Sequence, residues 1–226
     1  GIPIVEIRRT KLDGWGRVMK RMMDVCGSIA ALTLASPVMV VAAAMVLMET
    51  GRPILYKNKR VGKFGNEFFL LKFRSMRQEY CTGEQFPHGK EAEAFEQKLI
   101  AERNTKEGPV YKIADDPRVT RVGKFLRRSS IDELPQFVNV LRGEMSLVGP
   151  RPHQSREVAN YERGQRQVLH IKPGMTGLPQ ISGRSDLSFE EEVRLDVLYM
   201  ERWGLLLDAI IILKTPFVLF RKRKAL

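Results

Sequence analysis

A long run of uncharged, mostly apolar residues near the start of the chain limits how this protein can fold. Residues 25–48 include no charged side chain. A helix of about 20 apolar residues reaches across the hydrocarbon core of a bilayer. The run is too long, and starts too late, for an ordinary secretory signal. A core helix this long and this uniformly apolar would be unusual in a chain of 226 residues. The run therefore predicts a membrane helix over about residues 22–49.

Ser36 and Pro37 lie at the centre of this run. Pro37 lacks a backbone N–H and its ring clashes with the preceding turn, so it predicts a kinked or broken helix, and Ser36 can satisfy a freed backbone group. Basic residues lie on both sides of the run: Lys11, Arg17, Lys20 and Arg21 before it, then Arg52, Lys57, Lys59, Arg60 and Lys63 after it. Basic flanks favour the cytoplasmic side, and only a re-entrant helix keeps both flanks there. Since proline also occurs in spanning helices, the residues alone leave both arrangements open.

A second apolar stretch covers about residues 204–220, where Asp208, Lys214 and Pro216 interrupt it. These interruptions make it a poor span and a better interfacial helix. The basic residues 221–224 that follow suit anionic lipid headgroups. The alternative is a core helix followed by a basic tail.

The charge balance narrows the class of partner. The net charge is +12, from 38 Lys and Arg against 26 Asp and Glu, which calls for nucleic acid, anionic lipid or a phosphorylated substrate. The two cysteines and three histidines form no metal-binding spacing, so the cysteines are expected to be reduced thiols. The chain has no P-loop, no G-x-G-x-x-G motif and no internal repeat.

An acidic pair, Asp132 and Glu133, lies within a basic stretch that begins at Arg127 and Arg128. Ser130 and Glu133 fit a capping box, which predicts a helix that starts at Ser130. The pair would then lie at a helix N-terminus, where backbone N–H groups and the helix dipole favour anions. Two carboxylates beside arginines would suit phosphoryl transfer. From the local spacing, a helix cap with surface salt bridges explains the same residues.

The rest of the chain predicts a mainly helical fold with a small β-hairpin, of the α+β class. Residues 54–56 and 67–73 flank a glycine turn and read as a hairpin. Residues 90–103 have helical spacing, with Ala94, Phe95, Leu99 and Ile100 on the apolar face. Residues 189–203 also look helical, with Ser188 as the cap and Glu191 three residues on. Residues 150–152 are stiff extended backbone that would hold Arg151 rigidly.

The ordered set of motifs resembles the bacterial sugar transferases, the monotopic polyprenyl-phosphate phosphoglycosyl transferases, and above all the catalytic domain of their long forms. The resemblance covers roughly residues 15–220. The matching segments are Lys20-Arg21-x-x-Asp24, Ser36-Pro37, residues 72–76, residues 116–123, residues 132–136 with Asn139-Val140, residues 143–152, residues 172–177, Ser182-Gly183-Arg184 and Asp196-x-x-Tyr199.

The resemblance implies transfer of a sugar-1-phosphate from a UDP-sugar, with a UDP-hexose favoured, to undecaprenyl phosphate, with release of UMP. This reaction is the first membrane step in the biosynthesis of exopolysaccharide, capsule or O-antigen. Asp132 matches the nucleophile of the family, which forms a covalent phosphosugar intermediate. Glu133, together with Asp132, matches the Mg²⁺ site. Arg127 and Arg151 match phosphate-binding arginines, and Arg184, Lys72 and Arg74 are assigned to the same task.

The resemblance also implies a location and a topology. The Ser36-Pro37 match favours a re-entrant helix at the cytoplasmic face of a bacterial inner membrane, among anionic lipids. Residues 1–19 are expected to be a linker from a longer protein, and residues 20–226 the catalytic domain. The polar insert at residues 78–107 receives no chemical role, and a homo-oligomer is compatible with the sequence.

Two other functions compete with the transferase. A membrane-tethered nucleic-acid-binding protein would explain the charge, but the chain has no matching RNA- or DNA-binding motif, so no nucleic acid partner is expected. A scaffold without chemistry would leave Asp132, Glu133 and residues 150–152 unexplained.

Overall fold

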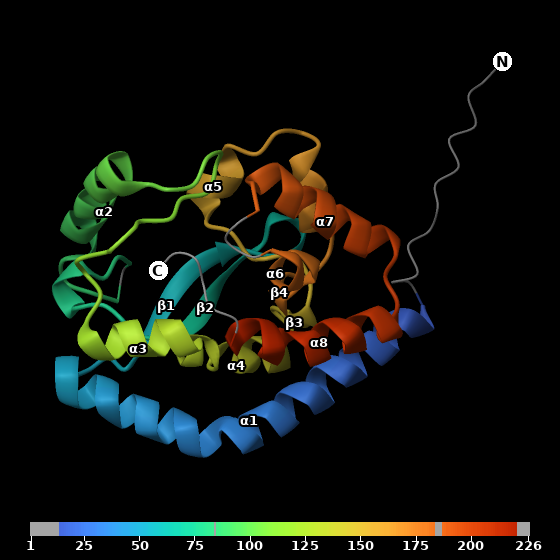
Figure 1. Ribbon diagram of the computed structural model, residues 1–226, viewed down its shortest axis with the longest axis horizontal. Helices are drawn as coiled ribbons and strands as arrows, with labels where there is room; N and C mark the ends of the chain where they lie inside the picture. The colour runs from blue at the N-terminus through green and yellow to red at the C-terminus, as the bar shows by residue number, and fades with distance from the viewer. Residues whose placement is uncertain (1–13, 84, 184–186, 221–226) are drawn as a thin grey trace.

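The computed structural model describes residues 14–83, 85–183 and 187–220. The helices are α1 (Trp15–Thr50), α2 (Gly89–Arg103), α3 (Arg121–Ser129), α4 (Gln136–Arg142), α5 (Ser155–Ala159), α6 (Leu178–Ser182), α7 (Phe189–Glu201) and α8 (Leu205–Phe220). The 3₁₀ turns are η1 (Lys63–Gly65), η2 (Gln78–Tyr80), η3 (Ile131–Glu133) and η4 (Gln165–His170), and the strands are β1 (Leu55–Val61), β2 (Glu67–Phe73), β3 (Ser146–Val148) and β4 (Gly174–Thr176). The predicted helical fold with a small hairpin is confirmed (Figure 1). The short parallel pair of β3 and β4 is an addition that the sequence did not indicate.

Helix α1 is longer than the predicted membrane helix and continues through Pro37. It bends near its middle but does not break (Figure 1). Pro37 has no N–H for the carbonyl of Thr33, four residues earlier, and the Ser36 hydroxyl donates to that carbonyl instead, at 2.8 Å. The prediction that Ser36 satisfies a freed backbone group is therefore confirmed. Among the described residues, α1 is the one helix long and apolar enough to cross a membrane, which by itself is weak evidence of a span.

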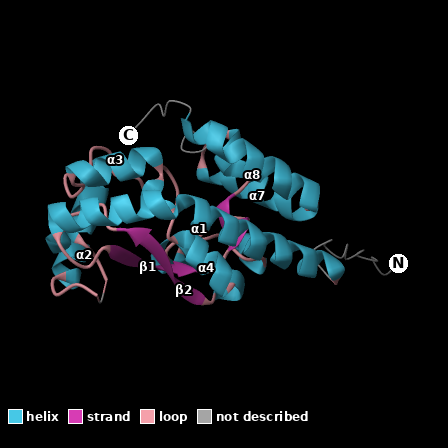
Figure 2. Ribbon diagram, turned by 90° about the horizontal axis from the view of Figure 1, so that it is seen from below, coloured by secondary structure: helices cyan, strands magenta, loops and turns pink. Residues whose placement is uncertain are grey.

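Both halves of α1 pack on the same body. In the first half, the Asp24 carboxylate accepts hydrogen bonds from the Ser146 hydroxyl and the Leu147 N–H, both at 2.9 Å. In the second half, Ala42 and Val46 are buried in a cluster with Phe73 of β2 and Leu126 of α3. Figures 1 and 2 show α1 lying along one side of the molecule over its whole length.

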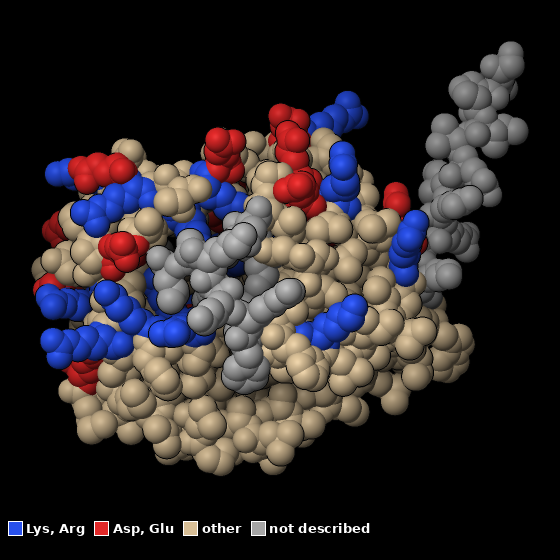
Figure 3. All heavy atoms as spheres, in the orientation of Figure 1, with Lys and Arg blue, Asp and Glu red and all other residues tan. Residues whose placement is uncertain are grey.

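The outer surface of α1 is apolar. Leu34, Val40 and Val41 are among its exposed side chains, and Leu34 is 82% exposed. Figure 3 shows that the lower edge of the molecule, which α1 forms, is nearly free of charged atoms, while Lys and Arg gather higher up, over α3. A large exposed apolar surface is more stable in contact with lipid than with water. This surface therefore supports the predicted contact with a membrane.

Helix α8 has features of both alternatives that the sequence left open, an interfacial helix and a core helix. Ile211 and Asp208 are fully buried against the main core, whereas Leu206, Leu213 and Phe217 are exposed. The buried carboxylate of Asp208 forms an ion pair with Lys20, whose Nζ lies 2.7 Å from Oδ2. Its other oxygen accepts a hydrogen bond from the Tyr199 hydroxyl at 2.8 Å. One face of α8 thus belongs to the core and the other is an apolar surface, while the basic residues 221–224 lie outside the described residues.

The hairpin of β1 and β2 is antiparallel, and Leu55 pairs with Phe73. At the other edge of β2, a side-chain amide forms hydrogen bonds with the strand backbone. Asn139 of α4 accepts from the Leu71 N–H at 3.0 Å and donates to the Phe69 carbonyl at 2.8 Å. This buried amide replaces a neighbouring strand and fixes α4, and the chain just before it, against the sheet.

Two predicted helices are confirmed, one with a correction. Helix α7 begins after Ser188 with the predicted capping box to Glu191. Helix α2 matches the predicted helix at residues 90–103, but Ala94 is exposed, and Ala92 and Glu96 are buried with Leu99. Phe95, Leu99 and Ile100 of the predicted apolar face are buried or partly buried, so the prediction is wrong only for Ala94. The charged Glu96 is buried as well, in ion pairs with Arg118 and Arg156.

Candidate active site

The acidic pair lies on η3, a single 3₁₀ turn between α3 and α4. The predicted capping box at Ser130 is wrong, since Ser130 ends α3 in the left-handed region at φ 58° and its side chain makes no cap hydrogen bond. An N-cap needs extended backbone, whereas left-handed backbone terminates a helix. Helix α4 therefore starts only at Gln136, and the helix-dipole argument for Asp132 and Glu133 loses most of its force.

Asp132 is held in a buried position, with 6% of its surface exposed. The residue before it, Ile131, packs on the apolar cluster that contains Val46 of α1 and Leu126 of α3. Helix α1 thus contributes to the apolar cluster on which the turn of Asp132 packs. A carboxylate in such a place needs cationic or hydrogen-bonding neighbours to stay charged.

Arg127 supplies a cation for Asp132. Burial lowers the pKa of the Arg127 guanidinium, and the negative charges of Asp132 and then Asp116 oppose this effect. Its Nε donates to the Ser75 hydroxyl at 2.8 Å, which fixes the plane of the guanidinium. The charges of Arg127 and Asp132 therefore act on each other, while their roles in a reaction stay predictions.

Glu133 pairs with Lys72 of β2. The Lys72 Nζ lies 2.7 Å from Glu133 Oε1, with side-chain exposures of 21% and 38%. Such a half-exposed pair contributes little to stability, but a ligand can reach it. The structure therefore brings together four of the predicted site residues: Lys72, Arg127, Asp132 and Glu133.

The other predicted phosphate-binding residues are Arg74, Arg151 and Arg184, and the structure describes the first two. Arg74 is buried, and its Nη2 donates to the carbonyls of Thr50 and Gly51, at 2.7 and 2.8 Å, where it caps the end of α1. Arg151 is exposed, and its charge acts on Arg60 and His153. Arg184 lies outside the described residues. The phosphate contacts of all three stay predictions, and the structure adds an anchoring role for Arg74.

A metal held by protein ligands alone finds no support. The described residues include no group of three or more His, Cys, Asp or Glu side chains that could hold an ion. The adjacent carboxylates of Asp132 and Glu133 nevertheless fit Mg²⁺, because this ion takes one or two carboxylates and fills its shell with phosphate oxygens and water.

Two residues of the site were not singled out from the sequence. Ser75 holds Arg127, and Gly123 lets α3 approach the Ser75 backbone, since a Cβ on Gly123 would lie 1.9 Å from the Ser75 carbonyl oxygen. The sequence signal for both was that they fall in matched motifs, Ser75 in residues 72–76 and Gly123 in residues 116–123.

Comparison with known proteins identifies the family of the chain. Residues 15–222 match the family described as "Bacterial sugar transferase". The chain is 41% identical over 214 residues to a UDP-galactose-lipid carrier transferase of Erwinia amylovora, covering 91% of this chain and 41% of that protein. It is 40% identical over 200 residues to the exopolysaccharide production protein ExoY of Sinorhizobium fredii, covering 88% of this chain and 84% of that protein.

A third relative is the undecaprenyl-phosphate galactose phosphotransferase of Salmonella typhimurium, 40% identical over 224 residues, which cover 98% of this chain and 44% of that protein. The chain thus spans about two fifths of the length of several curated relatives and most of the length of ExoY. The match to the family covers nearly all of the described residues, including every element that builds the site. This chain belongs to the bacterial sugar transferase family.

Proposed function

We propose that this protein transfers a sugar-1-phosphate from a UDP-hexose to undecaprenyl phosphate and releases UMP. The observation that carries the proposal is the buried Asp132 carboxylate on a turn between Arg127 and the Lys72–Glu133 pair, directly above an apolar helix. One site thus combines a carboxylate that can attack phosphorus, cations that can bind phosphate, and an apolar helix that can contact lipid. The names of the relatives cited above supply the donor and acceptor classes.

In the first step, an oxygen of Asp132 attacks the β-phosphorus of the donor. A P–O bond forms to the carboxylate, the pyrophosphate P–O bond breaks, and UMP leaves with the bridging oxygen. Arg127 is placed to balance the charge of Asp132 in the free enzyme and that of the phosphoryl oxygens during attack. Lys72 offers a second positive charge beside Glu133.

In the second step, an oxygen of the lipid phosphate attacks the phosphorus of the acyl phosphate. The bond to Asp132 breaks, the carboxylate is restored, and the undecaprenyl-diphosphate-sugar forms. Two displacements at a shared carboxylate avoid the direct approach of two anionic phosphates. Asp132 and Glu133 would hold Mg²⁺, which when bound supplies positive charge to the pyrophosphate.

We also propose that α1 is re-entrant, with both ends on the cytoplasmic face. The support is that both halves of α1 contact one catalytic body, Asp24 near its start and Val46 near its end. A helix that crossed the bilayer would carry one half away from that body. Single cysteines that replace Trp15 or Arg52, in a background with Cys26→Ser and Cys81→Ser, test this topology with an impermeant maleimide. Labelling of both from the cytoplasmic side alone is expected, and labelling of either from the other side would refute re-entrance.

The activity is tested by UMP release from purified protein in nanodiscs with Mg²⁺. UDP-galactose and UDP-glucose are supplied first, then their N-acetyl relatives, each with and without undecaprenyl phosphate. With one or two donors we expect sustained UMP release only when the lipid is present, and no more than one UMP per enzyme without it. Asp132→Asn, which is nearly isosteric, should release none. Silence of the folded wild type with every nucleotide sugar would overturn the proposal, and an active Asp132→Asn variant would remove the nucleophile from the scheme.

A further inference from the structure

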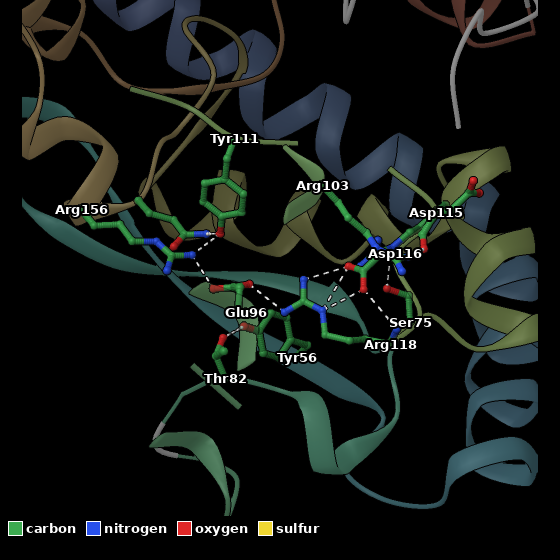
Figure 4. A network of polar contacts seen from close by, with 12 residues as sticks. Tyr56, Ser75, Thr82, Glu96, Arg103, Tyr111, Asp115, Asp116, Arg118 and Arg156 are labelled. Carbon is green, nitrogen blue, oxygen red and sulfur yellow. Dashed lines mark hydrogen bonds and ion pairs between the residues drawn. The ribbon is translucent and has the colours of Figure 1, made fainter. Parts of the chain in front are cut away.

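A chain of buried charges of alternating sign runs from α5 through α2 toward the catalytic turn. Arg156 of α5 pairs with Glu96 of α2, and the other oxygen of Glu96 accepts from Arg118 Nη1 at 3.0 Å. Arg118 in turn grips Asp116, with its Nε 2.8 Å from Oδ1 and its Nη2 2.8 Å from Oδ2. Figure 4 shows Arg156 and Tyr111 at one end of this network and Asp116, Arg118 and Ser75 at the other.

These ionic groups are far more buried than surface ion pairs. The side chains of Arg118 and Asp116 are 3% and 7% exposed, and that of Glu96 is 11% exposed. Burial alone would raise the pKa of Asp116, but the hydrogen bonds and charge of Arg118, followed by the charge of Arg127, bring it below its usual value. Buried ion pairs often add little net stability compared with apolar residues, so their presence suggests a role in fixing a geometry.

The backbone connects this network to the active site. The segment that contains Asp116 and Arg118 pairs with the strand end at Ser75: the Arg77 N–H donates to the Arg118 carbonyl at 3.1 Å, and the Thr120 N–H donates to the Ser75 carbonyl at 3.1 Å. The Ser75 hydroxyl then accepts from Arg127 Nε. The conformation that Arg118 imposes on residues 116–120 is therefore passed on to the residue that orients Arg127.

We propose that Glu96, Arg118 and Asp116 are positioning residues that hold Arg127 toward Asp132, so that the polar insert containing α2 takes part in the transfer reaction. This inference rests on the function proposed above. Glu96 has a central place in it, because it joins α2 to both Arg118 and Arg156. Loss of its charge would remove the carboxylate shared by the buried Arg118 and the partly exposed Arg156, and would loosen the segment beside Ser75.

A double-mutant cycle tests the inference. Glu96→Gln keeps the size of the side chain and removes its charge, and Glu93→Gln is the matched control, an exposed glutamate of the same helix. The Arg127→Lys variant supplies the second background. UMP release is measured in nanodiscs. The rate is divided by the concentration of active enzyme, which is the amount of UMP released in a single turnover without lipid acceptor, so that unfolded protein does not affect the result.

Glu96→Gln is expected to lower kcat about tenfold in the wild-type background and less than about twofold in the Arg127→Lys background. The two effects should be non-additive because Glu96 is proposed to act through Arg127. Glu93→Gln should change neither rate. Equal fold losses in both backgrounds, or an unchanged rate in Glu96→Gln, would overturn the inference. If Glu96→Gln does not fold, the charge-retaining Glu96→Asp enters the same cycle with the same criterion. Failure of the wild type to release UMP would instead count against the proposed function.

Discussion

Substitution of alanine at Gly123 is a sharp test of how the fold positions Arg127. Gly123 lies in the first turn of α3, where the helix meets the backbone of Ser75. A Cβ there would lie 1.9 Å from the Ser75 carbonyl oxygen and 2.7 Å from its carbon, whereas ordinary contacts begin at 3.4 Å. The oxygen is backbone and cannot rotate away, so α3 and the end of β2 must separate by about 1.5 Å, the difference between 3.4 and 1.9 Å.

This separation has two expected consequences. Overpacking of a close backbone contact costs about 1–3 kcal/mol of unfolding free energy, which corresponds to about 2–4 °C in Tm for each kcal/mol in a domain of this size. Arg127 lies one turn further along α3 and would move with it, away from Ser75 and from its place beside Asp132. A misplacement of about 1 Å at a reacting centre can cost about a hundredfold, so we expect kcat for UMP release to fall by about that factor.

The assay compares kcat and Tm of Gly123→Ala with those of Gly164→Ala in identical nanodiscs. Gly164 has helical backbone, at φ −67° and ψ −31°, and nothing lies within 4 Å of a Cβ placed there. Gly164→Ala should therefore keep wild-type activity and lose no stability. A Gly123→Ala variant with wild-type kcat and Tm would show that the close approach of α3 to Ser75 does not control the site.

Three further predictions concern single side chains. Ser36→Ala should lower the stability of the membrane-bound protein by about 1–2 kcal/mol, because the Thr33 carbonyl loses its donor in an apolar surrounding, and an unchanged melting curve in nanodiscs would contradict this. Lys72→Met should remove the positive charge 2.7 Å from Glu133 and reduce kcat/KM for the donor about tenfold, as measured by UMP release; full activity would remove Lys72 from the site. Burial raises the pKa of the Cys81 thiol to about 11, so little reactive thiolate exists at pH 8, and iodoacetamide should modify Cys81 in urea but not in the folded protein, as read by peptide mass spectrometry.

Several elements of this protein can be predicted from short stretches of sequence, because the interactions that determine them are between residues close together in the chain. The apolar run that contains Pro37 predicts a bent membrane helix, since a missing N–H perturbs any helix and a neighbouring serine can compensate. The cap at Ser188 was predictable because a capping box is complete within four residues. Asp132, Glu133 and Arg127 could be proposed because they match residues of the family, although their local spacing did not distinguish them from an ordinary helix cap.

The tertiary structure decided the features that depend on distant partners. A capping box was expected at Ser130, but packing of Leu126 and Ile131 on α1 accompanies a left-handed residue and a 3₁₀ turn there. Glu96 looked like a solvent-facing residue of a polar insert until Arg118 and Arg156 were seen to enclose it. Arg74 likewise lies at the end of α1 because the carbonyls it binds are brought there by folding. Sequence determined the elements and the candidate chemistry, while the burial of charges was settled only by the residues that the fold places around them.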